Sequence, residues 1–572
     1  MTSWVKAIAG ALGAVLGVVL AVRPFASVSL LLLALGIGLI VSGIVEMLQR
    51  GESARRERSY GRWNRVLLSV LLVATGVFVL VFPGAGLRVT VAVGAVLLLV
   101  GGLRDLLSGL IGKEHRIANL LGGTASLVFG VLALSWRDIT VLAFGLIFGV
   151  WLALRGGRLL LDAVGEFRGV ARPRERSPRQ WPRIAWGAVS LVLAVALAAL
   201  GNKLAGTPRP DEFYALPADV PSAAGTLLRA EPFTRAMPDG ASAWRILYTT
   251  TRDEGVPAVA SGLVVVPDDI DQPPIIAWDH GTTGAAVGCA PTLLPDPLAS
   301  GAMPDPAAVI AAGWAIVATD YIGLGADSPH EYLVGQPVGR ATLDAVRAAR
   351  QLMGVSLGGQ VAVWGHSQGG GAALWTGGLA ASYAPEIDVV GVAAMAPAAN
   401  LPAMIDELAN EKAGTLVGPL ALAGFAERYD DVRVTDYLRP AATLLYEETL
   451  ARCWSDPAML VSVAQAVVID RPIWSRSPNE GPLSQRLEEN VPRLPIAAPL
   501  MIAQGLADTL VLPDAQGTYV DELCAAGQKV DYRTFDGEDH VSVVSAGSPL
   551  LDELVQWTTD RFAGAPATDT CR

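Results

Sequence analysis

The fold of the second half of this chain is decided by one stretch, Val361-Ala362-Val363-Trp364-Gly365-His366-Ser367-Gln368-Gly369. Its first four residues are apolar and predict a short buried strand. Small residues follow from Gly369 to Ala373, and they let a helix begin close against that strand. The stretch therefore predicts a sharp junction of strand, turn and helix, with Ser367 at the turn.

The five residues from Gly365 to Gly369 match G-x-S-x-G, a pattern in which the central serine acts as a nucleophile. A second match occurs at Gly354-Val355-Ser356-Leu357-Gly358. There a helical pattern precedes the serine and a strand follows it, which is the reverse of the order that the turn requires. We therefore interpret Ser367 as the nucleophile and Ser356 as a loop serine.

Strand and helix patterns alternate on both sides of this stretch. Apolar or alternating runs predict strands at 245–250, 258–267, 275–278, 314–319, 361–364, 389–395, 500–503 and 530–535. Amphipathic patterns predict helices at 305–312, 341–353, 371–383, 515–526 and 549–562. This alternation predicts a mostly parallel sheet flanked by helices, as in the α/β-hydrolase fold. Residues ~400–499 interrupt this alternation, because their patterns are largely helical, and they are expected to form an inserted cap.

A serine nucleophile in this fold needs an acid and a histidine, which follow it in the order Ser, Asp or Glu, His. The chain has five histidines, and only His540 lies after Ser367. His540 would take the serine proton as general base, and Asp508, at the end of a strand pattern, would orient its ring. The competing acids are Asp514, Asp536, Glu538 and Asp539. The last three lie too near His540 in sequence to turn back onto its ring.

The negative charge that develops on the reacting oxygen needs two backbone N–H donors. One is expected from Gln368, directly after the nucleophile. The second is expected from Thr282 or Gly281, in the loop after the third predicted strand. Three further polar residues are expected to brace these loops without taking part in the chemistry: His280, Asp320 and Tyr321.

The chain divides into two parts of opposite charge. Residues 1–205 contain 22 Lys and Arg against nine Asp and Glu, a net charge of +13, whereas the remaining residues carry −24. The whole chain is also 52% hydrophobic. A basic, apolar part followed by an acidic one predicts a transmembrane helical domain at 1–205, a linker at 206–232 and a catalytic domain at 233–572. This distribution does not favour binding to nucleic acid.

Seven hydrophobic stretches before residue 205 are long enough to span a bilayer. They lie at about 5–22, 27–48, 64–83, 88–111, 117–135, 139–161 and 184–202. The first leads directly into the others, which argues against a cleaved signal peptide. Basic residues concentrate after the second, fourth and sixth stretches, at 50–65, 113–116 and 168–183. Because basic loops stay in the cytoplasm, the amino terminus is expected inside and the acidic domain outside.

The first six stretches form three copies of a helical hairpin. The segments 19–25, 79–83 and 131–136 occupy the same place in each copy, about 52–60 residues apart. Repeats of this length usually encode a unit that stacks on itself. The arrangement resembles the HdeD-like family of small bacterial membrane proteins, a resemblance that implies no defined chemistry. The few acidic residues of the stretches lie towards the cytoplasmic ends, so anchoring or scaffolding is expected rather than transport.

All four cysteines, Cys289, Cys453, Cys524 and Cys571, lie in the acidic part. They show no C-x-x-C spacing, so a zinc site is not expected. An even number within one domain indicates two disulfides and an oxidising compartment, in agreement with an outward-facing domain. Three pairings are possible. Cys289–Cys453 and Cys524–Cys571 are favoured, the second because it would tie down the C-terminal tail.

Several motifs together resemble the secretory lipase family of α/β-hydrolases over roughly residues 210–565. They are the 278–284 loop, Gly288-Cys289-Ala290-Pro291, the 320–325 segment, the turn at Ser367, Gly505 with Asp508, and His540. The resemblance implies hydrolysis of carboxylic esters, including acylglycerols, by Ser367, Asp508 and His540 without a metal or cofactor. It also implies a cap over an acyl tunnel. Members are usually secreted, whereas this domain follows seven predicted spans.

The sequence therefore predicts a membrane-anchored serine esterase or lipase that faces outward and acts on lipid or other esters. Two alternatives use the same three residues, namely an acyltransferase and a peptidase. A third is a membrane scaffold or stress protein whose soluble part binds without turnover. The intact set of Ser, Asp and His argues against this last alternative, because a degenerate hydrolase is expected to lose one of the three.

Overall fold

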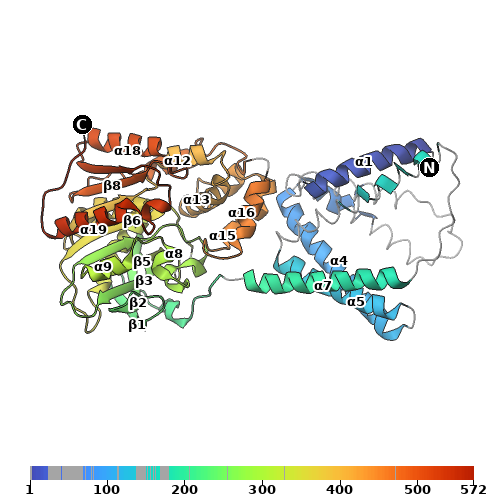
Figure 1. The fold of residues 1–572 in the computed structure, drawn as a ribbon, viewed down its shortest axis with the longest axis horizontal. Coiled ribbons are helices and arrows are strands. Elements are labelled where there is room, and N and C mark those ends of the chain that lie inside the picture. Colours follow the sequence, from blue (N-terminus) through green and yellow to red (C-terminus); the bar gives the residue numbers. More distant parts are fainter. Residues whose placement is uncertain are drawn as a thin grey trace. The chain divides into compact units, whose positions relative to one another are not determined.

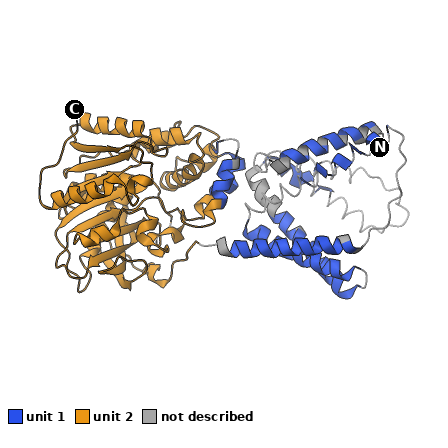
Figure 2. Cartoon of the chain, in the orientation of Figure 1, with its two compact units in different colours: residues 1–205, 439–448, 461–473 blue, residues 206–438, 449–460, 474–572 orange. Residues whose placement is uncertain are grey.

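Two compact units make up the chain (Figure 2). Unit 1 contains residues 1–205, 439–448 and 461–473, and unit 2 contains residues 206–438, 449–460 and 474–572. The computed structural model describes residues 207–571 except 254, 327–328 and 470–471. In the amino-terminal part it describes residues 3–22, 83–112, 115–136 and 180–204, with short stretches within 40–81 and 150–167.

A nine-stranded sheet forms the centre of unit 2 (Figure 1). Its strands are β1 (Leu227–Phe233), β2 (Ala241–Asp253), β3 (Val256–Pro267), β4 (Ile275–Asp279), β5 (Ala315–Ile322), β6 (Gln360–His366), β7 (Asp388–Met395), β8 (Leu500–Gly505) and β9 (Val530–Phe535). They are ordered β1-β2-β3-β5-β4-β6-β7-β8-β9. The pairs from β5 to β9 are parallel, and the pairs among β1, β2, β3 and β5 are antiparallel.

Helices cover both faces of this sheet. They are α8 (Pro297–Ser300), α9 (Pro306–Ala311), α10 (Gly335–Ala349), α11 (Gln368–Tyr383), α18 (Pro513–Ala525) and α19 (Pro549–Phe562). One core joins α10, α11 and α18 to strand residues such as Ile275 and Val361. The other core joins α9 and α19 to the neighbouring residues of the same strands, such as Ile276 and Ala362. Successive side chains of a strand point to opposite faces, so a strand buried on both sides is apolar throughout.

The eight predicted strands and the five predicted helices all have counterparts in unit 2, and the α/β-hydrolase fold is confirmed. The predicted cap is also largely helical. It contains α12 (Leu401–Leu408), α13 (Gly414–Arg428), α14 (Val434–Tyr437), α15 (Thr443–Leu450), α16 (Met459–Val468) and α17 (Pro482–Glu489). All six helices lie between β7 and β8, so the cap enters the fold at the carboxyl end of a central strand.

One element differs from the sequence prediction. Residues 227–232, which were expected in the linker, form most of β1 and pair antiparallel with β2. β1 is an edge strand with partly exposed residues, and it carries Arg229, Glu231 and Pro232. Charges and proline are tolerated at a sheet edge because one side of the strand needs no partner. The same residues gave the segment the composition of a linker.

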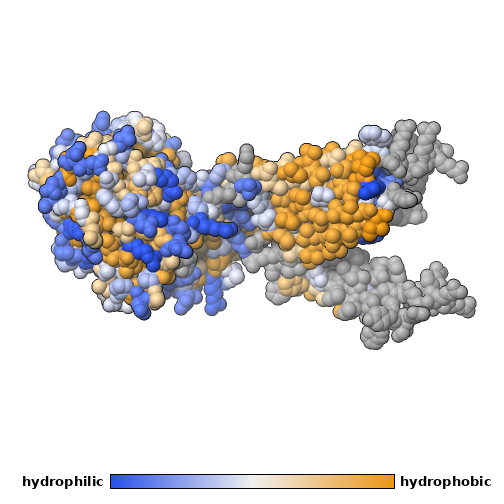
Figure 3. Space-filling view, turned by 90° about the horizontal axis from the view of Figure 1, so that it is seen from below, coloured by the Kyte–Doolittle hydropathy of each residue, from blue (hydrophilic) through white to orange (hydrophobic). Residues whose placement is uncertain are grey.

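Unit 1 contains the helices α1 (Ser3–Val22), α4 (Pro83–Ile111), α5 (Arg116–Ser135) and α7 (Gln180–Leu204), together with most of α15 and α16. Three helical segments in the described residues are long and apolar enough to cross a membrane: Ala92–Ile111, Arg116–Ser135 and Arg183–Asn202. Their outer surfaces are apolar (Figure 3), with Val96, Val131 and Val192 more than half exposed. The predicted spans 27–48 and 139–161 lie largely outside the described residues, and the span 64–83 lies partly outside them.

Candidate active site

Ser367 lies between β6 and α11, where the backbone turns sharply. Its φ of 59° and ψ of −121° belong to a region that residues with a Cβ rarely adopt. A Cβ on Gly365 would overlap the carbonyl of Gly369, and a Cβ on Gly369 would overlap the carbonyl of Asp279. Glycine is therefore required on both sides of the serine, which is the physical reason for the G-x-S-x-G pattern. Ser356 lies in the loop between α10 and β6.

Three side chains from three different loops meet at the carboxyl edge of the sheet. Ser367 follows β6, Asp508 follows β8 and His540 follows β9. His540 Nε2 lies 2.8 Å from Ser367 Oγ, and His540 Nδ1 lies 2.8 Å from Asp508 Oδ2. The His540 side chain is 12% exposed and that of Asp508 is fully buried. This geometry lets the imidazole accept the serine proton at Nε2 while its Nδ1–H donates to the carboxylate.

The Asp508 carboxylate is held by hydrogen bonds on both oxygens. Oδ1 accepts the N–H groups of Leu510 and Val511, each at 2.8 Å. Oδ2 accepts Gln504 Nε2 at 3.1 Å in addition to His540. Burial by itself would raise the pKa of Asp508, but the bond from His540 and the two backbone N–H groups outweigh it and lower the pKa. Asp508 is therefore charged at neutral pH, as a partner for a histidinium must be.

The donors expected to stabilise an oxyanion come from α11 and from the loop after β4. The Gln368 N–H is at the first position of α11, where a helix supplies no acceptor. The Gly281 N–H donates to Gly301 O at 2.9 Å, so it is already engaged. Within the described residues the Thr282 N–H has no such acceptor. Of the two loop candidates, Thr282 is therefore the better donor.

The side chains of these two donor residues have buried partners that the sequence did not reveal. Thr282 Oγ1 lies 2.7 Å from the hydroxyl of Tyr332. The Gln368 amide lies 3.4 Å from Nε2 of His330. Burial lowers the pKa of His330 to about 4, so its ring is neutral and can accept from the amide. His330 and Tyr332 lie in a segment without a recognisable motif, and no sequence signal identified them.

Comparison with known proteins identifies relatives of both parts of the chain. Residues 306–570 match the family model of the secretory lipases. The carboxyl-terminal part of the chain is thus similar to the secretory lipases, as its motifs predicted. Residues 8–69, 67–126 and 121–199 match a second model, described as a short repeat of unknown function (DUF308), which is the HdeD-like membrane family. These three successive matches confirm the three copies of the repeat.

The relatives of the secretory lipase domain are lipases and esterases. A protein described as a probable inactive lipase of Mycobacterium tuberculosis is 26% identical over 391 residues, which cover 63% of this chain and 84% of that protein. A secreted triacylglycerol lipase of Malassezia globosa is 25% identical over 413 residues, which cover 67% and 87%. Homology therefore indicates that the chain is a carboxylic ester hydrolase of the lipase type.

The fold of the secretory lipase domain also occurs in a solved lipase structure. Candida antarctica lipase A in its closed state has a TM-score of 0.52 and 20% identity, with 63% of this chain and 87% of that chain covered. A likeness at this level of identity concerns the fold alone. The particular residues that carry the chemistry must therefore be argued from this chain.

Asp279 is a buried acid of the lipase domain to which sequence analysis gave no role. It ends β4, and its carboxylate accepts hydrogen bonds from Thr342 and Thr376 on α10 and α11. Burial raises the pKa of Asp279 to about 7, although these bonds oppose the rise. The carbonyl of Asp279 also contacts Gly369 of the turn. Asp279 thus joins the oxyanion loop to both helices, and an Asp directly after a buried strand was the available signal.

The residues expected to brace the active-site loops do make bracing contacts. The Tyr321 hydroxyl donates to His280 O at 3.1 Å, and the centroids of the two tilted rings lie 4.3 Å apart. Asp320 accepts Ser261 Oγ at 2.5 Å and the Thr292 N–H at 3.0 Å. Burial lowers the pKa of His280 to about 4, so the ring is neutral. None of these groups contacts the Ser367 hydroxyl in the described structure.

Both favoured disulfides are present. Cys289 pairs with Cys453, and Cys524 pairs with Cys571. The first joins the loop after β4 to the cap. Beside it the Trp454 N–H donates to Thr283 O at 2.8 Å, so this disulfide fixes the backbone directly after Thr282. The second joins α18 to the C-terminal tail and touches no residue of the site.

Removing these disulfides is expected to affect the enzyme differently. The double variant Cys289→Ala/Cys453→Ala should lose at least about tenfold in kcat, because a misplaced oxyanion donor costs up to ~10²–10³-fold. The matched variant Cys524→Ala/Cys571→Ala should keep its kcat. Each should lower the unfolding free energy by roughly 2–4 kcal/mol. Ester hydrolysis and thermal unfolding of the full chain in detergent measure both effects, and an equal kcat for the two variants would contradict this role.

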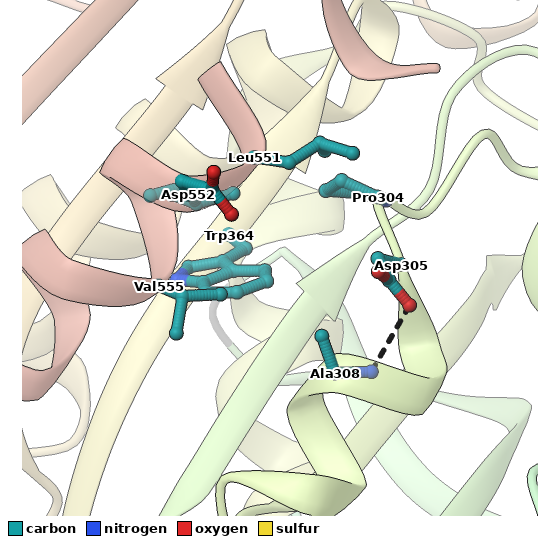
Figure 4. A pocket seen from close by; sticks show the side chains of 8 residues that line it. Pro304, Asp305, Ala308, Trp364, Leu551, Asp552 and Val555 are labelled. Atoms are coloured by element: carbon teal, nitrogen blue, oxygen red, sulfur yellow. Dashed lines mark hydrogen bonds between the residues drawn. The ribbon is translucent and has the colours of Figure 1, made fainter. Parts of the chain in front are cut away.

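A shallow pocket elsewhere in the lipase domain is not part of the site. It lies between α9 and α19 (Figure 4). Its lining includes Trp364, Asp305 and Asp552, and none of Ser367, Asp508 or His540. In Figure 4 the Asp305 carboxylate is engaged in capping α9 through the Ala308 N–H. Among the described residues no group of His, Cys, Asp and Glu is arranged to hold a metal ion.

Proposed function

We propose that this protein is a membrane-anchored, extracytoplasmic serine carboxylesterase or lipase whose catalytic residues are Ser367, His540 and Asp508. The observation that carries the proposal is the unbroken series of contacts from Ser367 Oγ through the His540 ring to Asp508 Oδ2, each 2.8 Å long. A serine on a strained turn, a neutral acceptor nitrogen and a buried carboxylate are the three parts that serine acyl transfer needs.

In the proposed reaction Ser367 Oγ attacks the carbonyl carbon of the ester, and its proton passes to His540 Nε2. The N–H groups of Gln368 and Thr282 stabilise the charge on the carbonyl oxygen. The intermediate collapses to an acyl-enzyme as His540 gives its proton to the leaving alcohol. Water then attacks the acyl-enzyme while His540 takes its proton. The acid leaves, and the proton returns to Ser367.

Lipid esters are the proposed substrate class. The relative from Malassezia globosa is described as a triacylglycerol lipase. The cap of this chain offers a run of apolar residues on α13, and Leu416, Leu420 and Phe425 of this run are buried. α13 reaches the site through Tyr332, because a Cβ on Gly424 would overlap the Tyr332 backbone and the Tyr332 hydroxyl contacts Thr282. Apolar side chains on this helix suit an acyl chain, since burial removes about 0.8 kcal/mol per CH₂ of unfavourable hydration.

Fluorophosphonate labelling of membranes that contain the full chain tests the enzymatic proposal. We expect one equivalent of label on Ser367, located by mass spectrometry of the peptide, and none on Ser356. Release of free acid from p-nitrophenyl esters and triglycerides without an added acceptor distinguishes a hydrolase from an obligate acyltransferase. One relative is described as a probable inactive lipase, so the test must also allow for loss of activity in this chain. A chain that fails to label would be a binding protein and not an enzyme.

We further propose seven membrane spans with the amino terminus in the cytoplasm and the lipase domain outside. The basic loops at 50–65 and 168–183 support this orientation through the positive-inside rule. The two disulfides support it independently, because they form in oxidising compartments. The described helices α4, α5 and α7 have the length and apolar surface that a bilayer requires.

Alkaline phosphatase fusions test this topology, because the phosphatase is active only outside the cytoplasm. A fusion after residue 572 is expected to be active, and a fusion within the basic loop at residue 175 is expected to be inactive. The second fusion is the matched control, since the two points lie on opposite sides of the proposed last span. Activity at residue 175 and not at residue 572 would reverse the orientation.

A further inference from the structure

His366, the residue before the nucleophile, contacts the loop of the proposed base. It is the last residue of β6 and only 3% exposed. Its Nε2 lies 2.8 Å from the backbone carbonyl oxygen of His540. A carbonyl can only accept, so the His366 ring carries its proton on Nε2 and donates it to His540. Residues 174 apart in sequence are thereby joined by one hydrogen bond.

This hydrogen bond has no substitute in the described structure. No other donor reaches the His540 carbonyl there. The neighbouring turn is held through Asp539, whose carboxylate accepts the N–H groups of Val541 and Ser542. Those bonds shape the residues after His540 but leave its own peptide carbonyl to His366. The position of the His540 backbone therefore depends on the side chain next to Ser367.

The His366 ring also lies between the base and the oxyanion loop. Its centroid is 4.9 Å from that of the His540 ring. A Cβ added to Gly281 would lie 3.5 Å from His366 Nδ1, so this nitrogen faces the backbone of the loop. His366 Nδ1 is buried and has no hydrogen-bond partner among the described residues. Burial, and next the neighbouring His540, lower the pKa of His366 to about 3. A neutral ring can support a charged His540 without repelling it.

We propose that His366 is a positioning residue, which holds the His540 imidazole in line with Ser367 and Asp508 by donating a hydrogen bond to the His540 backbone carbonyl. This inference rests on the proposed function of the three residues. It gives the variable position of the G-x-S-x-G pattern a role in this chain. His366 is next to Ser367 in the chain and bonds to the His540 backbone, so His540 moves together with the Ser367 turn. The distance between Ser367 Oγ and His540 Nε2 is thereby kept.

The test compares two amide substitutions at this position in the full chain. His366→Gln places its amide nitrogen near the position of the imidazole Nε2, whereas His366→Asn carries the same amide one methylene shorter and cannot reach the carbonyl. We expect His366→Gln to keep kcat within about threefold of the wild type. His366→Asn should lose about 10- to 100-fold in kcat with KM little changed, because small displacements of a catalytic group have costs of this size.

Turnover of p-nitrophenyl butyrate is measured per active site, with the sites counted by fluorophosphonate titration, so unfolded protein does not enter the result. Equal kcat values for the two variants, or a loss confined to KM, would overturn the inference while the proposed function stands. A wild-type protein that neither labels nor turns over the ester would overturn the proposed function, and this inference with it. The two failures are therefore distinguishable.

Discussion

Replacing Ser367 with alanine is expected to lower kcat for ester hydrolysis by about 10⁵- to 10⁶-fold, the loss found when a serine nucleophile that works with a histidine is removed. The substitution deletes the Oγ that lies 2.8 Å from His540 Nε2, and no other hydroxyl is placed to replace it in the described site. A small residual rate over water should persist, because the oxyanion donors and the cap are unchanged. Initial rates with p-nitrophenyl esters measure the loss.

Ser356→Ala is the matched control for this experiment. Ser356 stands in the second G-x-S-x-G match, in the loop between α10 and β6, and its substitution should leave kcat and labelling unchanged. Ser367→Ala should also keep the unfolding temperature of the wild type, since the hydroxyl contacts His540 alone among the described side chains. Normal turnover by Ser367→Ala, or a loss in Ser356→Ala, would show that the nucleophile has been assigned to the wrong serine.

The arrangement around the serine could be anticipated because its signals are local in sequence. Ser367 follows an apolar strand and precedes small residues, and the sharp turn results from overlaps that any Cβ at Gly365 or Gly369 would cause. His540 was selected because no other histidine follows Ser367. The parallel strands were visible as apolar runs, since both of their faces are buried.

The supporting residues could not be anticipated because their roles arise from contacts between distant segments. His366 contacts the His540 carbonyl, and His330 contacts the Gln368 amide, yet neither partner is marked by the local pattern. Asp279 is marked in the sequence as an acid after a buried strand, but the threonines on α10 and α11 that satisfy its carboxylate are not. A buried polar side chain is stable only when it has hydrogen-bond partners. A single sequence does not show which distant residues provide those partners.

The amino-terminal part illustrates a different limit. Hydropathy identifies apolar helices because the bilayer excludes unsatisfied backbone, and it therefore predicted segments such as those in α5 and α7. It carries little information about packing, because lipid and neighbouring helices are equally apolar. Small residues are the exception: a Cβ at Gly102 of α4 would overlap Gly123 of α5, so glycine allows these two helices to approach closely.

Asp508→Asn is expected to lower kcat by about 10⁴-fold while KM changes little, since it reverses the tautomer of the base. The N–H groups of Leu510 and Val511 both donate to Asp508 Oδ1, so the amide oxygen of the variant must take that place. Its NH₂ group then faces His540 Nδ1, which becomes an acceptor. The ring proton moves to Nε2, and Nε2 can no longer accept the proton of Ser367.

Asp514→Asn serves as the control for the acid. Asp514 competed with Asp508 in the sequence and lies in the first turn of α18, exposed to solvent, so its substitution should leave kcat unchanged. Fluorophosphonate labelling of Asp508→Asn should be slowed to a similar extent as turnover, because both reactions need the activated serine. A Ser367 that labels at the wild-type rate in Asp508→Asn would mean that His540 takes its orientation from another group, and Asp508 would lose its proposed role.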